Sequence, residues 1–207
     1  MELKLAHIDA IIFDLGGVLI EVDYNRTILA FEKLGISNAK ELYSQKAQTE
    51  LFNQIECGEI TPHFFLNELL KFCPKKTKIS EVKEAWNAII GPYNKRIITL
   101  LKELKKKHKL FVLSNTNAIH IEKANLEWAK ISDKPIDYFF DKVYLSHKIG
   151  DRKPNESVFI KICKEQGLDK NKTLFIDDSI QHIKAANKLG LKTNHLKSME
   201  EIYSFLS

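Results

Sequence analysis

The feature that most constrains this 207-residue chain is a short apolar run that stops at a carboxylate and two glycines. Residues 9–21 read DAIIFDLGGVLIE, and the stretch from Ala10 to Phe13 has the continuous apolar character of a strand buried on both faces. A charged Asp14 at the exit of such a strand costs free energy unless it is paired or functional. Ligands of open α/β sheets bind outside the carboxyl ends of strands, so Asp14 is a candidate site residue, although capping of the next element is an equally good interpretation.

The second half of the chain alternates between strand and helix patterns, which is typical of a parallel sheet. Strands are predicted at 110–114 (LFVLS), 142–145, 173–177 (TLFID) and 192–196, and helices at 95–107, 119–131, 155–166, 180–189 and from 199 onward. Together with the first strand, this pattern predicts an α/β fold with a three-layer, doubly wound, Rossmann-like parallel sheet.

The segment after the first strand has a different pattern, with amphipathic pieces and no strand signal. The predicted helices there cover 24–34, 42–55, 61–72 and 80–90. Thr61 followed by Pro62 is a favourable helix start, and Ser80 is expected to cap the last helix. We therefore predict two parts: a catalytic core of residues 1–20 and 93–207, and a helical-bundle cap of residues 21–92. The large apolar residues expected to pack inside the cap are Phe64, Phe65, Phe72 and Trp86.

Polar side chains stand at the ends of four predicted strands. They are Asp14 after the first strand, Ser114 and Asn115 at the second, Lys153 after the third, and Asp177 and Asp178 at the fourth. Parallel strands bring these ends to one edge of the sheet. Three carboxylates gathered there repel one another unless a cation neutralises them, and Mg²⁺ prefers carboxylate and phosphate oxygens. With Lys153 and Ser114 available to phosphoryl oxygens, the edge predicts phosphoryl transfer.

These motifs, in this order, resemble those of the haloacid dehalogenase (HAD) superfamily of hydrolases. The matching stretches are FDLGGVL, LSNTN, the lysine of RKP, FIDDS and the continuation IKAANKLGLKT. The resemblance covers the whole chain, and the helical insertion looks like the family's type-one cap. The closest likeness is to bacterial sugar-phosphate phosphatases related to α-D-glucose-1-phosphate phosphatase. It implies a Mg²⁺-dependent phosphatase that acts on a small phosphorylated metabolite, such as a sugar phosphate, through an aspartyl-phosphate intermediate.

The resemblance also implies the metal ligands. Asp14 matches the nucleophile, which also binds Mg²⁺, and the backbone carbonyl of Gly16 matches another ligand. Asp178 matches the direct metal ligand of the fourth motif, and Asp177 matches a supporting acid.

The substrate contacts that the resemblance implies lie at two other strand ends. Ser114 and Lys153 match the residues that hold the phosphoryl oxygens, and Lys153 also restrains Asp14. The backbone N–H of Asn115 is expected as an extra donor. In the cap, Arg26 is expected to contact substrate, and Glu56, Gly58 and Glu59 form a polar turn that either contributes to specificity or only caps helices.

One departure from the family pattern concerns acid–base chemistry. Most phosphatases of the family carry a second Asp two residues after the nucleophile, but here that position is Gly16. General acid–base catalysis contributes about 10²- to 10⁴-fold in rate, so we expect slow turnover unless another group substitutes. The resembled subgroup lacks the same Asp. His120 or a substrate group is a hypothetical proton source, and the alternative is that His120 is a surface residue at a helix start.

Two other functions fit the motifs less well. A 2-haloacid dehalogenase also uses an attacking carboxylate and lacks the second Asp, but it needs no metal, which would leave Asp177 and Asp178 unexplained. A non-catalytic protein that binds phosphorylated ligands would have no reason to retain the other site groups.

The composition sets limits on partners and location. The net charge of +5 is mild, and the run from Lys102 to Lys109 reads as a solvated helix end, so no nucleic-acid partner is expected. No apolar run is long enough for a membrane span, the start MELKLAHID does not resemble a signal peptide, and the three cysteines are widely spaced. We expect a cytoplasmic protein, with the oligomeric state left open.

Overall fold

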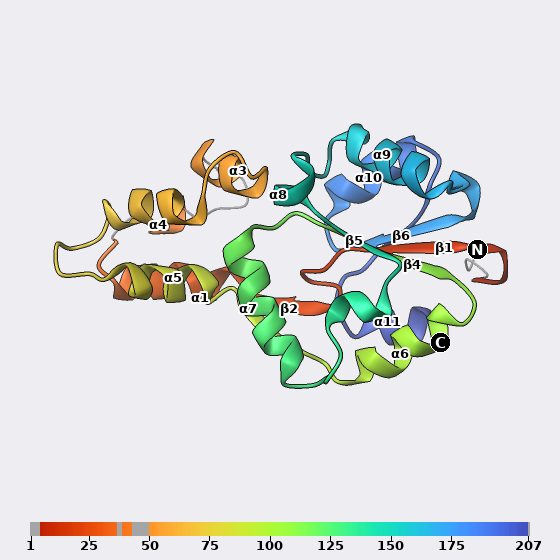
Figure 1. Cartoon of the computed structure of the whole chain (residues 1–207), viewed down its shortest axis with the longest axis horizontal. Helices are drawn as coiled ribbons and strands as arrows, with labels where there is room; N and C mark the ends of the chain where they lie inside the picture. The colour runs from red at the N-terminus through yellow and green to blue at the C-terminus, as the bar shows by residue number, and fades with distance from the viewer. Residues whose placement is uncertain (1–4, 37–38, 43–49, 207) are drawn as a thin grey trace.

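Five parallel strands form the centre of the computed structural model, which describes residues 5–36, 39–42 and 50–206 (Figure 1). In order across the sheet they are β5 (Lys142–Leu145), β4 (Lys109–Ser114), β1 (Ala10–Phe13), β6 (Thr173–Asp177) and β7 (Lys192–His195). β1 pairs in parallel with both β4 and β6, so the first motif lies in the middle of the sheet. The predicted α/β sheet is confirmed.

Helices cover both faces of this sheet (Figure 1). One face packs against α6 (Arg96–Lys105), α7 (Ala118–Ala129) and α11 (Glu201–Phe205), and the other against α9 (Glu156–Gln166) and α10 (Ile180–Lys188). The period of two along β1 decides which side chain goes where, since Ile11 and Phe13 join the first apolar cluster and Ile12 joins the second. The shorter helices are η1 (Leu5–His7), η2 (Ile136–Phe139), α8 (Ser146–Ile149) and η3 (Lys170–Lys172).

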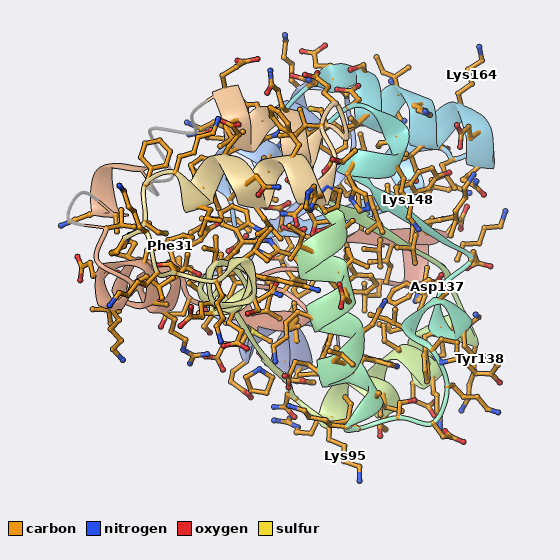
Figure 2. The ribbon with its side chains drawn as sticks, turned by 60° about the vertical axis from the view of Figure 1, so that its left-hand side comes forward. Phe31, Lys95, Asp137, Tyr138, Lys148 and Lys164 are labelled. Atoms are coloured by element: carbon orange, nitrogen blue, oxygen red, sulfur yellow. The ribbon has the colours of Figure 1, made fainter. Side chains whose placement is uncertain are left out.

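The cap segment builds its own apolar cluster. Its helices are α1 (Tyr24–Lys33), α2 (Ala39–Leu42), α3 (Glu50–Glu56), α4 (Pro62–Leu70) and α5 (Ile79–Asn87). Phe52, Phe65 and Trp86 stack in the centre, with the Phe52 and Trp86 rings 5.3 Å apart and nearly parallel. Ile119 of α7 joins this cluster, so the cap packs on that helix. Figure 1 shows α1, α4 and α5 on the far side of α7 from the sheet, and in Figure 2 Phe31 lies among these helices.

The connection between cap and core differs from the prediction. Two short antiparallel strands, β2 (Ile20–Val22) and β3 (Ile90–Tyr93), join the parts, where the sequence predicted no strand and a helix as far as residue 90. Pro92 is tolerated because a two-stranded ribbon consists of edge strands, where a missing N–H costs no ladder bond. The division into the two predicted parts itself stays a prediction.

Three expectations within the cap need correction or restriction. Ser80 is not a cap: α5 begins at Ile79, and the carboxylate of Glu81 accepts a hydrogen bond of 2.7 Å from the Lys78 N–H. Phe64 and Phe72 are half exposed rather than packed inside: Phe64 lies on the solvent side of α4, and Phe72 lies in the turn after that helix ends at Leu70. The predicted helix over 42–55 is seen only at its ends, since residues 43–49 lie outside the described residues.

The basic side chains at the end of α6 point to solvent. Lys102, Lys105 and Lys106 are exposed around the end of α6, as a solvated helix end requires. Figure 2 shows Lys95 and Lys164 pointing outward from opposite ends of the molecule rather than toward a shared surface. Among the described residues, no helix combines the length and apolar character that crossing a bilayer would take.

Candidate active site

The carboxyl ends of β1, β4 and β6 open into a cavity of about 800 Å³ between the sheet and the cap. Six of the sequence-predicted site residues line it: Asp14, Gly16, Ser114, Asn115, Lys153 and Asp178. Asp14 continues the ladder of β1, because its N–H donates to the Ile176 carbonyl at 2.9 Å. The structure therefore brings these strand-end residues to one cavity.

Lys153 holds the centre of this rim. Its side chain is 0% exposed, and Nζ lies 2.9 Å from Asp14 Oδ1 and 2.7 Å from Asp177 Oδ2. Because a buried cation is stable only when paired, the two carboxylates fix the lysine between β1 and β6.

Asn115 positions the loop that carries Lys153. Its Oδ1 accepts from the Lys153 N–H at 2.9 Å, and its Nδ2 donates to the Lys153 carbonyl at 2.8 Å. This two-way clamp was not foreseen, since the sequence assigned Asn115 only a backbone N–H toward substrate. That backbone role stays a prediction, while the side chain binds the end of β4 to the lysine loop.

Ser114 ends β4 and is nearly fully buried beside the clamp. The loop that follows is fixed by a reciprocal pair: the Thr116 N–H donates to Ser146 Oγ at 2.8 Å, and the Ser146 hydroxyl donates to the Thr116 carbonyl at 2.9 Å. β4 and β5 are thereby joined beyond their last paired residues, which gives the Ser114 hydroxyl a rigid setting at the cavity.

Burial and the neighbouring charges shift the pKa values of Asp14, Asp177 and Lys153. Burial raises the pKa of Asp14 to about 8, with Asp177 and Asp178 adding to the rise and Lys153 opposing it. Burial would also raise the pKa of Asp177, but Lys153 and His182 outweigh it and hold the value below its usual range. For Lys153, burial is outweighed by Asp14 and Asp177, and the pKa is raised. One cation thus serves three carboxylates.

The glycine turn after β1 is in contact with the fourth motif. Gly17 has φ of 72°, a conformation that favours glycine, and a Cβ built on it would lie 2.2 Å from Asp178 Oδ2. Burial, followed by repulsion from Asp177, raises the pKa of Asp178. The Asp178 carboxylate therefore rests against the backbone of the first motif.

The donor set fits a hard divalent cation. One ligand atom each from Asp14, Asp177 and His182 lie within 4.8 Å of one another, and Asp178 and Gly16 line the same cavity. Burial raises the pKa of Asp14, and Lys153 opposes the rise, so further positive charge at this point would stabilise the carboxylate. Carboxylate and carbonyl oxygens are the ligands that Mg²⁺ takes, so Asp14, Asp178 and Gly16 suit this ion.

His182 was missed by the sequence reasoning. Its Nδ1 lies 3.0 Å from both carboxylate oxygens of Asp177, which is also held by the Ser179 N–H at 2.7 Å. Asp177 thus makes contacts to three groups, consistent with a supporting rather than a leading role. The only signal in the sequence was position: a residue in the first turn of a helix that follows a strand end faces that strand end.

His120 is neither a surface residue nor an available acid. It is buried on α7, stacks on Trp86 with ring centroids 4.7 Å apart, and Nε2 lies 3.1 Å from the Trp86 carbonyl. Nδ1 lies 3.1 Å from the Asn117 amide nitrogen. Burial lowers the pKa of His120 to about 4. A neutral imidazole with both nitrogens engaged holds the cap to α7 and is a poor proton donor.

Arg26, the expected cap contact, lies at the hinge. It pairs with Glu21, and its Nε lies 3.5 Å from Asp23 Oδ2. Its side chain is 45% exposed, and it is not among the described residues that line the cavity. The geometry therefore gives no support for Arg26 as a substrate contact.

Arg152, directly before the lysine, was also not foreseen. Its Nη1 lies 3.0 Å from Glu56 Oε2 and 2.6 Å from Asn53 Oδ1, both on α3 of the cap. Glu56 had been noted only as part of a polar turn. No local pattern could join residues about a hundred positions apart.

Sequence comparison finds one matching family and several similar phosphatases. A family model described as haloacid dehalogenase-like hydrolase matches residues 11–195. The D-ribitol-5-phosphate phosphatase of Bacteroides thetaiotaomicron is 30% identical over 183 residues, covering 88% of this chain and 89% of that protein. A glyceraldehyde 3-phosphate phosphatase of Pyrococcus abyssi is 27% identical over 205 residues, covering 90% of this chain and 80% of that protein.

Solved structures agree with the sequence matches. The HAD family enzyme BT-2542 of Bacteroides thetaiotaomicron superposes with a TM-score of 0.89 at 31% identity, covering 97% of this chain and 98% of that one. The same enzyme in complex with magnesium and inorganic phosphate gives a TM-score of 0.85 at 32% identity, with 92% and 95% covered. L-2-haloacid dehalogenase PA0810 shares the fold, with a TM-score of 0.60 at 19% identity over 91% of this chain and 84% of that one.

Proposed function

Because this chain belongs to the haloacid dehalogenase-like hydrolases, and relatives that resemble it are phosphatases, we propose that it is a Mg²⁺-dependent phosphatase of small phosphorylated metabolites. The observation that carries the proposal is the rim cluster, in which Lys153 lies 2.9 Å from Asp14 and 2.7 Å from Asp177. A magnesium and phosphate complex of a similar enzyme supports the choice of ion and ligand.

Asp14 is the proposed nucleophile. Its Oδ1 accepts from the Leu15 N–H at 2.6 Å and faces Lys153, so these contacts leave Oδ2 to attack phosphorus. The attack forms an aspartyl-phosphate as the bond from phosphorus to the leaving oxygen breaks, and water then releases inorganic phosphate. Lys153 keeps the carboxylate oriented and, with the Ser114 hydroxyl, binds phosphoryl oxygens.

Asp14, Asp178 and the Gly16 carbonyl would hold Mg²⁺, with Asp177 in support. When bound, the ion supplies positive charge that neutralises the carboxylates and the phosphoryl oxygens. The need for it follows from the burial of Asp14, whose charge Lys153 alone does not offset.

Protonation of the leaving-group oxygen is the step for which this site lacks the usual acid, because Gly16 stands at that position. It has no side chain to donate a proton, and His120 is held by Trp86 and Asn117. We therefore expect fast turnover of p-nitrophenyl phosphate, whose phenolate leaves without a proton, and slower turnover of alkyl phosphates.

The test is hydrolysis of p-nitrophenyl phosphate with and without Mg²⁺, alongside halide release from 2-chloropropionate. We expect phosphate release that stops when EDTA removes the metal and no halide release. Halide release without metal would instead make the protein a dehalogenase. Binding of inorganic phosphate with no turnover of any ester would make it a non-catalytic phosphate-binding protein.

The preferred metabolite is a finer question. The relatives named above act on D-ribitol 5-phosphate and glyceraldehyde 3-phosphate, and the first motif resembles sugar-phosphate phosphatases. A panel of sugar, polyol and triose phosphates would rank the substrates, with the highest kcat/KM expected among monophosphates of small polyhydroxy compounds.

A further inference from the structure

Arg152 forms a partly buried ion pair between the core and the cap. Its Nη1 lies 3.0 Å from Glu56 Oε2 and 2.6 Å from Asn53 Oδ1, and the side chains of Arg152 and Glu56 are 16% and 17% exposed. Burial raises the pKa of Glu56, while Arg152 and then Lys153 oppose the rise. The pair is therefore more shielded from water than the cap–core pair of Lys83 and Glu122, whose side chains are 37% and 60% exposed.

This cluster lines the same cavity as the catalytic rim. Asn53, Glu56 and Arg152 contribute to its wall together with Asp14 and Ser114. Since the phosphoryl group of a substrate must lie at the rim, the rest of the substrate extends into the space that the cap closes. Apolar side chains such as Phe52 and Trp86 form another part of that wall. The cluster is thus a polar part of the wall that the leaving group meets.

The charges of the cavity wall disfavour a second anion. Among the described residues that line the cavity, the lysine and arginine side chains are Lys153 and Arg152, and each already has a carboxylate partner. A carboxylate on the leaving group that reached this part of the wall would meet Glu56, and the nearby Arg152 is already paired with that residue. A hydroxyl can instead donate to Glu56 or Asn53 and accept from the guanidinium, which has five N–H donors.

We propose that Glu56, Asn53 and Arg152 form a specificity subsite that selects phosphate monoesters with a neutral, hydroxyl-bearing leaving group. The inference rests on the proposed phosphatase function, of which it specifies the substrate class. Glu56 acts here by occupying Arg152, so that the guanidinium is offered to hydroxyls and not to anions.

The test compares two esters that differ at one carbon. Glycerol 3-phosphate carries a terminal CH₂OH where 3-phosphoglycerate carries a carboxylate. With Mg²⁺ present, we expect the wild-type kcat/KM to be at least about tenfold higher for glycerol 3-phosphate, the discrimination that one hydrogen bond to a charged group supplies.

Two variants should move this preference in opposite directions. Glu56→Gln removes the carboxylate and frees Arg152, so the ratio of kcat/KM for 3-phosphoglycerate to that for glycerol 3-phosphate should rise about tenfold or more. Arg152→Gln leaves Glu56 without its cation, so the same ratio should fall. A merely structural role would lower both rates together and leave the ratio unchanged.

Glu122→Gln is the matched control, because it breaks an exposed cap–core ion pair in which Lys83 Nζ lies 2.8 Å from Glu122 Oε2. It should leave the ratio as in the wild type. A wild-type preference for 3-phosphoglycerate, or an unchanged ratio in both cluster variants while p-nitrophenyl phosphate is still hydrolysed, would overturn the subsite alone. Failure of the wild type to hydrolyse all three esters would overturn the proposed function and the subsite with it.

Discussion

The rim of the sheet and the boundary between cap and core are held together in different ways. At the rim, Lys153 and Asp177 are 0% exposed and each makes several charged or hydrogen-bonded contacts. At the boundary, Lys83 and Glu122 are 37% and 60% exposed, and Arg152 contacts α3 from a single loop. The groups to which we assign the chemistry are fixed by many contacts. The groups that we propose to meet the leaving group lie where the cap contacts the core.

The difference follows from burial. A charge inside the protein is tolerated only with full pairing, so the rim has little freedom to rearrange. An exposed pair contributes at most about 1 kcal/mol and can separate without much cost. We therefore expect the rim to tolerate substitution less well than the exposed part of the boundary. Single substitutions at the rim and at the boundary test this contrast.

The largest effect is expected for Asp14→Asn. Without the nucleophile, kcat for p-nitrophenyl phosphate should fall by at least about 10³-fold. Since Asn can still accept from the Leu15 N–H and removes a charge that burial disfavours, Tm without divalent cation should not decrease. Steady-state kinetics and thermal unfolding measure the two effects. Residual turnover above a tenth of the wild-type value would remove Asp14 from the nucleophile's role.

Lys153→Met should affect stability as well as activity. It leaves Asp14 and Asp177 buried without their cation, which should lower the free energy of unfolding by about 3–5 kcal/mol. Urea denaturation without Mg²⁺ measures this loss, and adding Asp177→Asn should recover part of it. Lys188→Met, which breaks a surface pair with Glu156, is the control and should change stability little. Equal losses in the two single variants would contradict the contrast.

The boundary also has a buried part, which His120→Gln probes. The pKa of His120 is lowered from 6.5 to about 4, so the unfolded chain takes up its proton first and stability is lost as pH falls from 6.5 toward 4. The loss reaches about 3 kcal/mol, and the Gln protein should lack it. Denaturation curves from pH 7 to pH 4 measure the difference. His63→Gln on α4 controls for the number of histidines, and a pH dependence identical in His120→Gln and wild type would be a contrary result.

The smallest effect is expected for Glu122→Gln. Both side chains of its pair with Lys83 are exposed, so the free energy of unfolding should change by less than about 1 kcal/mol and the change should vanish in high salt. Urea denaturation at low and high ionic strength measures it. A loss as large as that in Lys153→Met would show that the boundary is as strongly held as the rim.

Much of the rim could be read from sequence because its signals are local. Each motif residue follows directly on an apolar strand, and parallel strands necessarily bring those ends together, as Asp14, Ser114 and Asp178 do in the cavity. The cap helices over 24–34 and 61–72 were also recognised, and Thr61 does cap α4 as predicted. The pairing of β2 with β3 was missed because the two strands are short and far apart in the sequence, and Gly91 and Pro92 are poor strand formers.

Side-chain partners could not be read in this way. Asn115 clamps Lys153 across 38 positions, His120 stacks on Trp86 from another part of the chain, and Arg152 reaches Glu56 in the cap. Each contact depends on the relative placement of elements that are far apart in sequence.

The sequence alone determined the family, the order of the five parallel strands and of the helices that flank them, and the edge of the sheet where chemistry-bearing residues gather, because backbone periodicity and motif spacing are properties of neighbouring residues. Only the tertiary structure decided which charge pairs with which, that His120 is buried and neutral, and that Arg152 turns to the cap while Lys153 turns to the rim. Burial and pairing are set by packing between distant segments, and they determine the electrostatics on which both the proposed reaction and its selectivity depend.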